Sequence, residues 1–179
     1  MLNVQLANKY AVAIFELAKE ENQLEAYGDQ LAEVSQTIAG QADLKAFINN
    51  PQVQPQAKKE LLSKLFKEGL ASSVYNFIML LIDKRRESIL EEIAGRYQAL
   101  SDAARNIVKA EITVAVALSE AQQASLVAKL EKVTGKTVFV STHIDKSILG
   151  GVIVKMGDKL IDGSVYSQMQ SLQKQLMAN

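Results

Sequence analysis

The first hundred or so residues carry their apolar side chains at helical spacing. In residues 3–20, Tyr10, Ile14 and Leu17 recur at steps of four and three, which places them along one line of a helix. Gly40 stands where a helix over residues 23–39 would end. The pattern predicts six helical segments, over about 3–20, 23–39, 43–49, a stretch following Pro55, 73–86 and 88–104.

After Arg105 the period changes from that of a helix to that of a strand. Ser119, with Gln122 three residues later, forms a capping-box pattern, and the helix it opens is expected to end at Gly135. Residues 138–144 alternate again, so strand, helix and strand imply two parallel neighbours. The apolar face of the first strand is predicted to consist of Val108, Ala110, Ile112, Val114 and Val116.

The stretch "GGVIVKMGDKLIDGSV", residues 150–165, predicts a β-hairpin. Residues 152–156 and 159–161 would pair across a two-residue turn in which Gly157 supplies a positive φ and Asp158 follows it. A phosphate-binding P-loop is excluded, because its second glycine and lysine are missing at the required spacing. Ser164 is the expected N-cap of a last helix, whose apolar stripe would be Val165, Met169, Leu172 and Leu176.

Together these patterns predict a protein of the α plus α/β class. An N-terminal six-helix bundle over residues 1–105 would be followed by a small C-terminal α/β domain over residues 106–179, with a mixed sheet and a β-hairpin. No Gly/Ser/Pro-rich linker marks the boundary, so we expect the last helix of the bundle to lead almost directly into the first strand.

Composition narrows the classes of partner. Twenty basic and twenty acidic residues cancel, which argues against a nucleic-acid-binding protein or one bound to an anionic membrane surface. The densest basic cluster, residues 84–86, is expected to be a solvated helix end. The longest apolar run, residues 77–82, is too short to span a bilayer, and the first residues predict no signal or transit peptide. We therefore expect a soluble chain that reaches a membrane only through partners.

No catalytic or metal-binding constellation is apparent. The chain has no cysteine, and its single histidine, His143, has no second metal-ligating neighbour in the pattern. Glu20–Glu21 and Glu91–Glu92 are adjacent in sequence, so on a helix they would point about 100° apart. We predict no catalytic residue, no metal and no cofactor.

Apolar surface exceeds what a small bundle needs. The apolar arc of residues 2–21 covers roughly 200° of a helical wheel, against the roughly 100° that faces a core. Residues 74–82, "VYNFIMLLI", contain one polar residue, Asn76. One interpretation is that residues 74–82 simply form the central helix of the bundle. The other is that this helix and the helix over residues 2–21 share a surface that buries a partner helix. The residues alone thus indicate a two-domain adaptor with an apolar docking surface.

Three stretches also resemble a known family. "KYAVAIFELAKE", "ALSEAQ" and above all "HIDKSILGGVIVKMGDKLIDGSV" are similar to the delta subunit of bacterial F-type ATP synthase, a relative of the mitochondrial oligomycin-sensitivity-conferring protein. Residues 22–104 match only in pattern. The motif residues that carry the resemblance are Asp145, Gly150, Gly151, Gly157, Asp158, Asp162, Gly163 and Ser164.

The resemblance implies a non-catalytic stator subunit that links the catalytic head to the peripheral-stalk b subunits, so that rotation is coupled to ATP synthesis. The bundle would bind the N-terminal helix of an alpha subunit, and the C-terminal domain would bind the b subunits. The location implied is peripheral, on the cytoplasmic side of the bacterial inner membrane, and the motif would preserve the hairpin and the helix start. The implied contacts to the alpha subunit are Tyr10, Ala13, Ile14, Leu17, Asn76, Met79, Leu80 and Asp83.

Two other hypotheses remain at this point. One is a generic helical adaptor or scaffold unrelated to ATP synthase, which different binding partners would distinguish. The other is a small enzyme, which a ligand bound in the C-terminal domain or a loss of activity on mutating His143 would favour.

Overall fold

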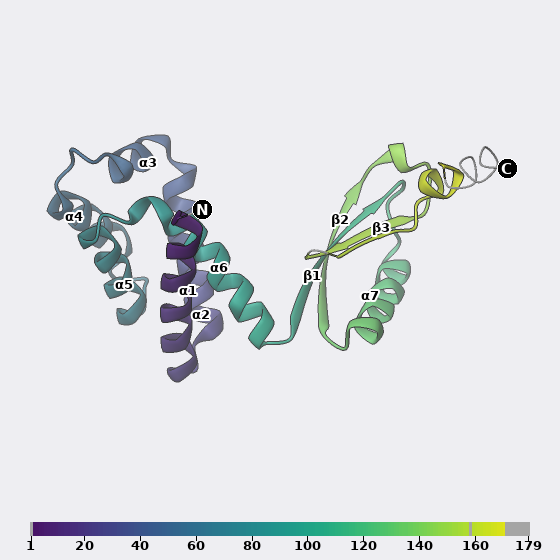
Figure 1. The fold of residues 1–179 in the computed structure, drawn as a ribbon, viewed down its shortest axis with the longest axis horizontal. Coiled ribbons are helices and arrows are strands. Elements are labelled where there is room, and N and C mark those ends of the chain that lie inside the picture. Colours follow the sequence, from purple (N-terminus) through teal and green to yellow (C-terminus); the bar gives the residue numbers. More distant parts are fainter. Residues whose placement is uncertain (1, 158, 171–179) are drawn as a thin grey trace. The chain divides into compact units, whose positions relative to one another are not determined.

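The computed structural model describes residues 2–157 and 159–170 of the chain, and side chains from residue 4 onward. The chain divides into two compact units, Met1–Ser101 and Asp102–Asn179. Figure 1 shows that the first consists of helices and that the second combines a small sheet with a helix.

The helices of the first unit follow the predicted order. Two ends differ from the prediction. Gly40 is the last residue of α2 and is followed by an extended Gln41, so no left-handed glycine ends this helix. The fifth helix stops at Asp83, because Arg85 adopts a left-handed φ of 54° and a short 3-10 turn follows. The elements are α1 (Leu2–Glu20), α2 (Leu24–Gly40), α3 (Ala42–Asn49), α4 (Pro55–Phe66), α5 (Ser72–Asp83), η1 (Glu87–Ile89) and α6 (Leu90–Ala104).

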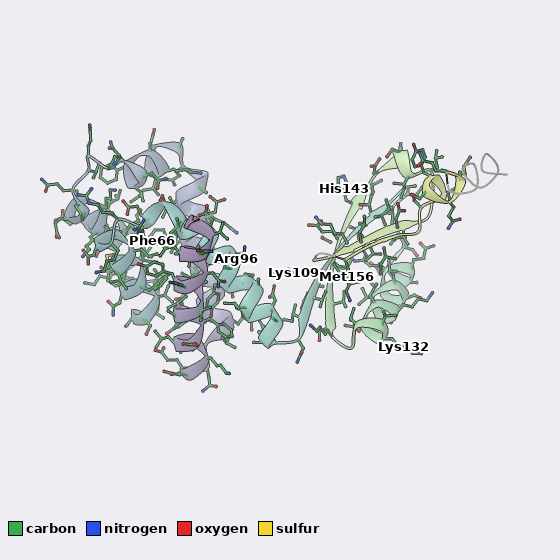
Figure 2. All side chains as sticks on the ribbon, in the orientation of Figure 1. Phe66, Arg96, Lys109, Lys132, His143 and Met156 are labelled. Atoms are coloured by element: carbon green, nitrogen blue, oxygen red, sulfur yellow. The ribbon has the colours of Figure 1, made fainter. Side chains whose placement is uncertain are left out.

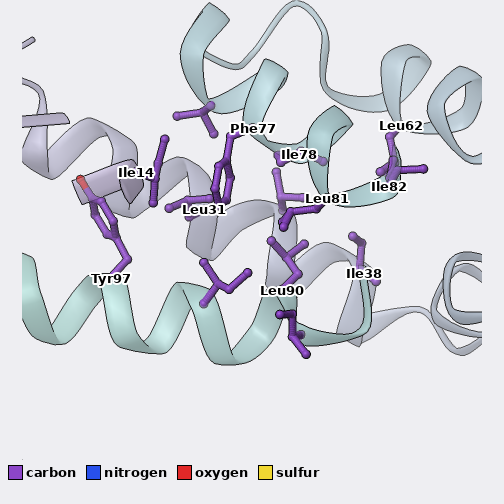
Figure 3. Packing of buried hydrophobic residues seen from close by; sticks show 14 of the residues in the cluster. Ile14, Leu31, Ile38, Leu62, Phe77, Ile78, Leu81, Ile82, Leu90 and Tyr97 are labelled. Carbon is purple, nitrogen blue, oxygen red and sulfur yellow. The ribbon is translucent and has the colours of Figure 1, made fainter. Parts of the chain in front are cut away.

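One apolar core joins these helices. Figure 3 shows Ile14 of α1, Leu31 of α2 and Phe77 of α5 among its closely packed members. Helix α1 contributes a line of small residues, Ala7, Ala11 and Ala18, that are fully buried. Small side chains on this buried line let neighbouring helices approach α1 closely. Large residues of the other helices then fill the space around it.

An ion pair and a hydrogen bond connect helices within this core. Lys58 of α4 is 2% exposed and pairs with Glu87 of η1. The hydroxyl of Tyr97 on α6 donates to the carbonyl oxygen of Leu24 at 2.8 Å. Burial, together with the nearby Tyr27, raises the pKa of Tyr97 to about 12. Since buried polar groups need partners, both interactions restrict how the helices can pack.

The second unit is built on a mixed four-stranded sheet in the order β2-β1-β3-β4. Strands β1 and β2 are parallel, as the strand–helix–strand pattern predicts, and β3 is antiparallel to both β1 and β4. Residues 165–170 are helical at the end of the described part. The elements are β1 (Ile107–Val114), α7 (Glu120–Thr134), β2 (Thr137–Ile144), η2 (Lys146–Ile148), β3 (Val152–Met156) and β4 (Lys159–Asp162).

Helix α7 packs on one face of this sheet (Figure 1) and closes a small core. Its predicted capping box, Ser119 with Gln122, is present, and Gly135 ends it with a φ of 67°. The prediction for Val116 was wrong: β1 ends at Val114, and the Val116 side chain is 75% exposed. Alternation continues in the sequence past the point where the strand loses its partners.

At the level of fold class, the prediction is confirmed. A helical part precedes a small α/β part with a mixed sheet and a hairpin.

Candidate subunit-binding site

Helix α5 has one buried and one exposed face. Its largest apolar residues, such as Phe77 and Leu81, lie in the core. Asn76, Leu80 and Asp83, which follow one another at steps of four and three, are exposed. Leu80 is 44% exposed although it is a leucine. The residues predicted on this helix therefore share one outward line, with Met79 half-buried beside it.

Helix α1 presents a narrower accessible face than predicted. Ala13 is exposed, and Tyr10 and Leu17 are half-buried. Ile14, by contrast, is only 2% exposed and belongs to the core. The physical reason is its position in line with the buried Ala11 and Ala18, a relation that the broad apolar arc of the sequence concealed. Ile14 is thus not accessible to a partner in this structure.

A ring contact and a hydrogen bond join α1 to α5, beside the core that both helices share. The rings of Tyr10 and Phe77 meet edge to face, with centroids 6.2 Å apart and an angle of 70° between their planes. At the other end of α1, the Ser73 hydroxyl donates to Oε1 of Glu21 at 2.9 Å. The end of α1 therefore lies at the beginning of α5, and the two helices run in opposite directions. The structure brings the two predicted sets of residues onto neighbouring helices.

Charged residues border this surface. Lys59 of α4 and Asp83 form an ion pair at 2.5 Å, so Asp83 already has a partner within the chain. Between α4 and α5 lies a groove of about 480 Å³ that sequence reasoning missed. Tyr75, an aromatic residue directly before Asn76, was the feature of the sequence that could have indicated this groove. The groove is lined by Gln56, Lys59, Glu60, Ser63, Lys64, Tyr75 and Met79.

The glycines of the hairpin motif meet strict steric demands. Gly157 has a φ of 56° in the turn between β3 and β4, as predicted. Gly151 has a φ of 81°, and a Cβ there would stand 2.2 Å from the carbonyl oxygen of Gly163. Beside Gly150, a Cβ would approach Val165 Cγ2 to 3.2 Å. Asp158, the remaining turn residue, lies outside the described residues.

The polar residues of the motif bond to nearby groups of the chain. Asp145 accepts from the Ser147 amide at 2.8 Å. Asp162 accepts from the Ser167 hydroxyl at 2.6 Å and the Ser164 amide at 2.9 Å, and these bonds hold its carboxyl pKa below the usual value. The Ser164 hydroxyl accepts from the Ser167 amide at 3.2 Å, which makes it the predicted N-cap. Leu172 and Leu176 of the predicted stripe lie outside the described residues, whereas Val165 and Met169 are exposed.

A second groove, of about 500 Å³, lies beside α7. Leu118, Leu126 and Val152 contribute apolar surface to its lining, and Gln122 and Lys129 add polar groups. Several apolar side chains of this unit are also exposed. They include Val116, Ile144 and Leu149, and Leu149 has a left-handed φ of 62°.

The remaining candidate features are isolated. His143 is exposed on the edge strand β2 (Figure 2). Within residues 2–157 and 159–170, no cluster of three or more His, Cys, Asp or Glu residues could hold a metal ion. None of the helices in that part is long and apolar enough to cross a membrane.

Both units carry exposed apolar residues and grooves, which favour a protein that binds other proteins over an enzyme. A sequence model described as "ATP synthase delta (OSCP) subunit" matches residues 6–176. The chain belongs to this family. It is therefore a non-catalytic stator subunit of the F-type ATP synthase, as the resemblance in its motifs implied.

Individual relatives agree along almost the whole chain. ATP synthase subunit delta of Desulforamulus reducens is 38% identical over 178 residues, which cover 99% of this chain and 98% of the relative. The Geobacter metallireducens protein of the same name is 36% identical over 174 residues, 97% of each chain. A chain in the cryo-EM structure of the Toxoplasma gondii mitochondrial ATP synthase hexamer shares the fold, with a TM-score of 0.75 and 22% identity over 97% of this chain and 98% of that one.

Proposed function

We propose that this chain clamps the catalytic head of the ATP synthase to its peripheral stalk through two separate surfaces. The six helices within residues 1–105 act as one bundle and bind the N-terminal helix of an alpha subunit. Residues 106–179 bind the b subunits. The site of action is the cytoplasmic face of the bacterial inner membrane, which the chain reaches through these partners.

One observation carries this proposal: α1 and α5 are in contact with each other, and each presents accessible residues that are partly apolar. Leu80 and Met79 on α5 supply apolar area, and Ala13 on α1 leaves room for a partner backbone to approach. Tyr10, which meets the Phe77 ring edge to face, is partly accessible on the α1 side. An amphipathic helix could bury its apolar stripe on such a surface.

A stator contact has a mechanical task. Torque on the rotor yields ATP only if the head cannot turn with it, so the clamp must bind tightly and stay stiff. An apolar contact suits this task because salt screens it little. The groove beside α7, with exposed Val116 and Ile144 on the same unit, supports a second contact of this kind with the stalk.

Calorimetric titration of the full chain with a synthetic peptide of the cognate alpha subunit's N-terminal helix tests the first contact. We expect saturable one-to-one binding with a negative change in heat capacity. Leu80→Asp should weaken it at least about tenfold, since a charge would be buried at the contact. The matched control is Leu65→Asp on α4, a leucine 51% exposed and outside the α1–α5 surface, which should bind like the wild type.

Absence of binding by a folded wild-type chain would refute the alpha-subunit proposal and favour a generic adaptor. The division of labour is tested by deleting residues 106–179. The remaining bundle should keep its circular dichroism and its affinity for the alpha peptide and should no longer bind the b subunits. A molten fragment would contradict the boundary at residue 105.

A further inference from the structure

Helix α5 begins without capping groups of its own. Its N-cap residue is Ala71, which has no side-chain acceptor, and its first turn contains no acidic residue. The first amides of a helix need acceptors, and the positive end of the helix dipole favours a negative charge. Helix α5 must therefore be capped from elsewhere in the fold.

Gln30 supplies an acceptor for one amide here, and Glu21 brings a negative charge to the first turn. Oε1 of Gln30 on α2 accepts from the Ala71 amide at 2.9 Å. Glu21, the residue directly after α1, accepts from the Ser73 hydroxyl in the first turn of α5 at 2.9 Å. The other carboxylate oxygen of Glu21 accepts from the hydroxyl of Tyr27 on α2, whose side chain is fully buried. One carboxylate thus connects three helices.

The Glu21 bridge is more directional than the apolar packing between α1 and α5. The Tyr10–Phe77 ring pair has a preferred edge-to-face geometry, but the burial of apolar surface around it is not directional. A charge-assisted hydrogen bond weakens steeply when its angle changes. Tyr27 is protonated at neutral pH and can donate, and burial with the bond to Glu21 raises its pKa further.

We propose that Glu21 is a positioning residue of the alpha-subunit-binding surface: by bridging Tyr27 and Ser73 it fixes where α5 begins against the end of α1. The inference rests on the proposed function. Asn76 and Leu80 follow Ser73 on the same helix, so a shift at Ser73 moves both relative to Ala13 and Tyr10 on α1. Glu21 lies beside the binding surface and acts on affinity through the register of the two helices.

The first test measures affinity of the full chain for the alpha-subunit peptide. Glu21→Ala should weaken binding about five- to tenfold at a temperature well below the melting transition. Ser73→Ala should weaken it similarly, and the double variant should lose no more than either single variant, because both remove one bridge. Glu21→Gln keeps an acceptor for Ser73 and should recover most of the affinity.

Glu20→Ala is the matched control, since Glu20 precedes Glu21, carries the same charge and forms no hydrogen bond or ion pair within the described part of the chain. It should bind like the wild type. If Glu21→Ala lowers the melting temperature but leaves affinity unchanged, Glu21 only stabilises the fold and the proposal is overturned.

The second test needs no partner. The chain has no cysteine, so spin labels can be placed uniquely at Glu16→Cys on α1 and Asn76→Cys on α5, both exposed positions. Glu21→Ala should shift or broaden the distance distribution between the labels, and Glu20→Ala should not. An unchanged distribution overturns the proposal. A changed distribution in a chain whose wild type binds no alpha peptide leaves Glu21 as the residue that positions α5 and rejects the proposed function alone.

Discussion

The two units of this protein maintain their folds by different means. In the helical unit, none of α2, α3, α4 and α5 has a side-chain cap at its own N-terminus among the described residues, and a large apolar core holds them together. In the described part of the α/β unit, the core is a smaller cluster of seven buried apolar residues, and this unit relies on the capping box of α7 and on glycines with positive φ. Packing specifies the first unit, and backbone geometry specifies much of the second.

This difference explains where the family resemblance is readable in the sequence. Many apolar residues can fill a helical core if volume and pattern are kept, which explains why only the periodicity of residues 22–104 resembled the family at first reading. Few residue types satisfy a left-handed φ beside a close backbone contact, as at Gly151. The recognisable motif, residues 144–165, therefore lies where the backbone restricts the choice of residue.

The largest effect is expected from a charge placed in the helical core. Ile14→Asp should unfold the first unit, at a cost of about 4 kcal/mol or more, because a carboxylate cannot be solvated at that site. Leu80→Asp should leave the free energy of unfolding within about 0.5–1 kcal/mol of the wild type. Denaturant unfolding monitored by circular dichroism compares the two. If the Ile14→Asp chain stays stable and loses only its affinity, Ile14 belongs to the binding surface and not to the core.

Next comes the buried ion pair. Lys58→Ala should cost about 3–5 kcal/mol, since it leaves the carboxylate of Glu87 largely buried and uncompensated. The double variant Lys58→Met with Glu87→Leu should regain most of that loss in the same unfolding measurement. If Lys58→Ala alone is harmless, packing rather than the ion pair holds α4 against η1.

In the α/β unit, replacing a glycine should cost more stability where other atoms lie close to the position of the new Cβ. Gly151→Ala should destabilise the unit by about 3 kcal/mol, through a strained φ and a clash with Gly163. Gly157→Ala, with a φ of 56° but no atom near its Cβ, should cost about 1–2 kcal/mol. Thermal unfolding by calorimetry measures both. Equal losses would show that steric contact adds nothing to backbone strain here.

The smallest effect concerns pH. The folded state raises the pKa of Tyr97 from 10.0 to about 12, so the stability from this group is complete below pH 10 and is lost as pH rises between these values. Tyr97→Phe should remove part of the alkaline loss of stability, as measured by urea unfolding at about pH 9 and about pH 11. An unchanged pH dependence would mean that other groups, such as Tyr27, cause it.

The sequence by itself determined the local elements. The change of period near residue 105, the capping box at Ser119 and the turn at Gly157 all follow from interactions among residues close in the chain, and each is present. The parallel pair β1–β2 followed from the crossover helix. The exposed residues of α5, Asn76, Leu80 and Asp83, were expected only through the family resemblance, because periodicity alone does not show which face of that helix is accessible.

Only the tertiary structure decided which edge of a broad apolar arc faces the core. Ala13 and Ile14 are neighbours in α1, and both lie within the apolar arc of its helical wheel. Ala13 is nevertheless exposed, whereas Ile14 is buried. The burial of Lys58 and the bridge from Glu21 to Ser73 likewise depend on residues far apart in the chain. Spacing along a helix fixes which residues share a face, but the direction of that face is set by the neighbouring helices, whose positions local periodicity does not contain.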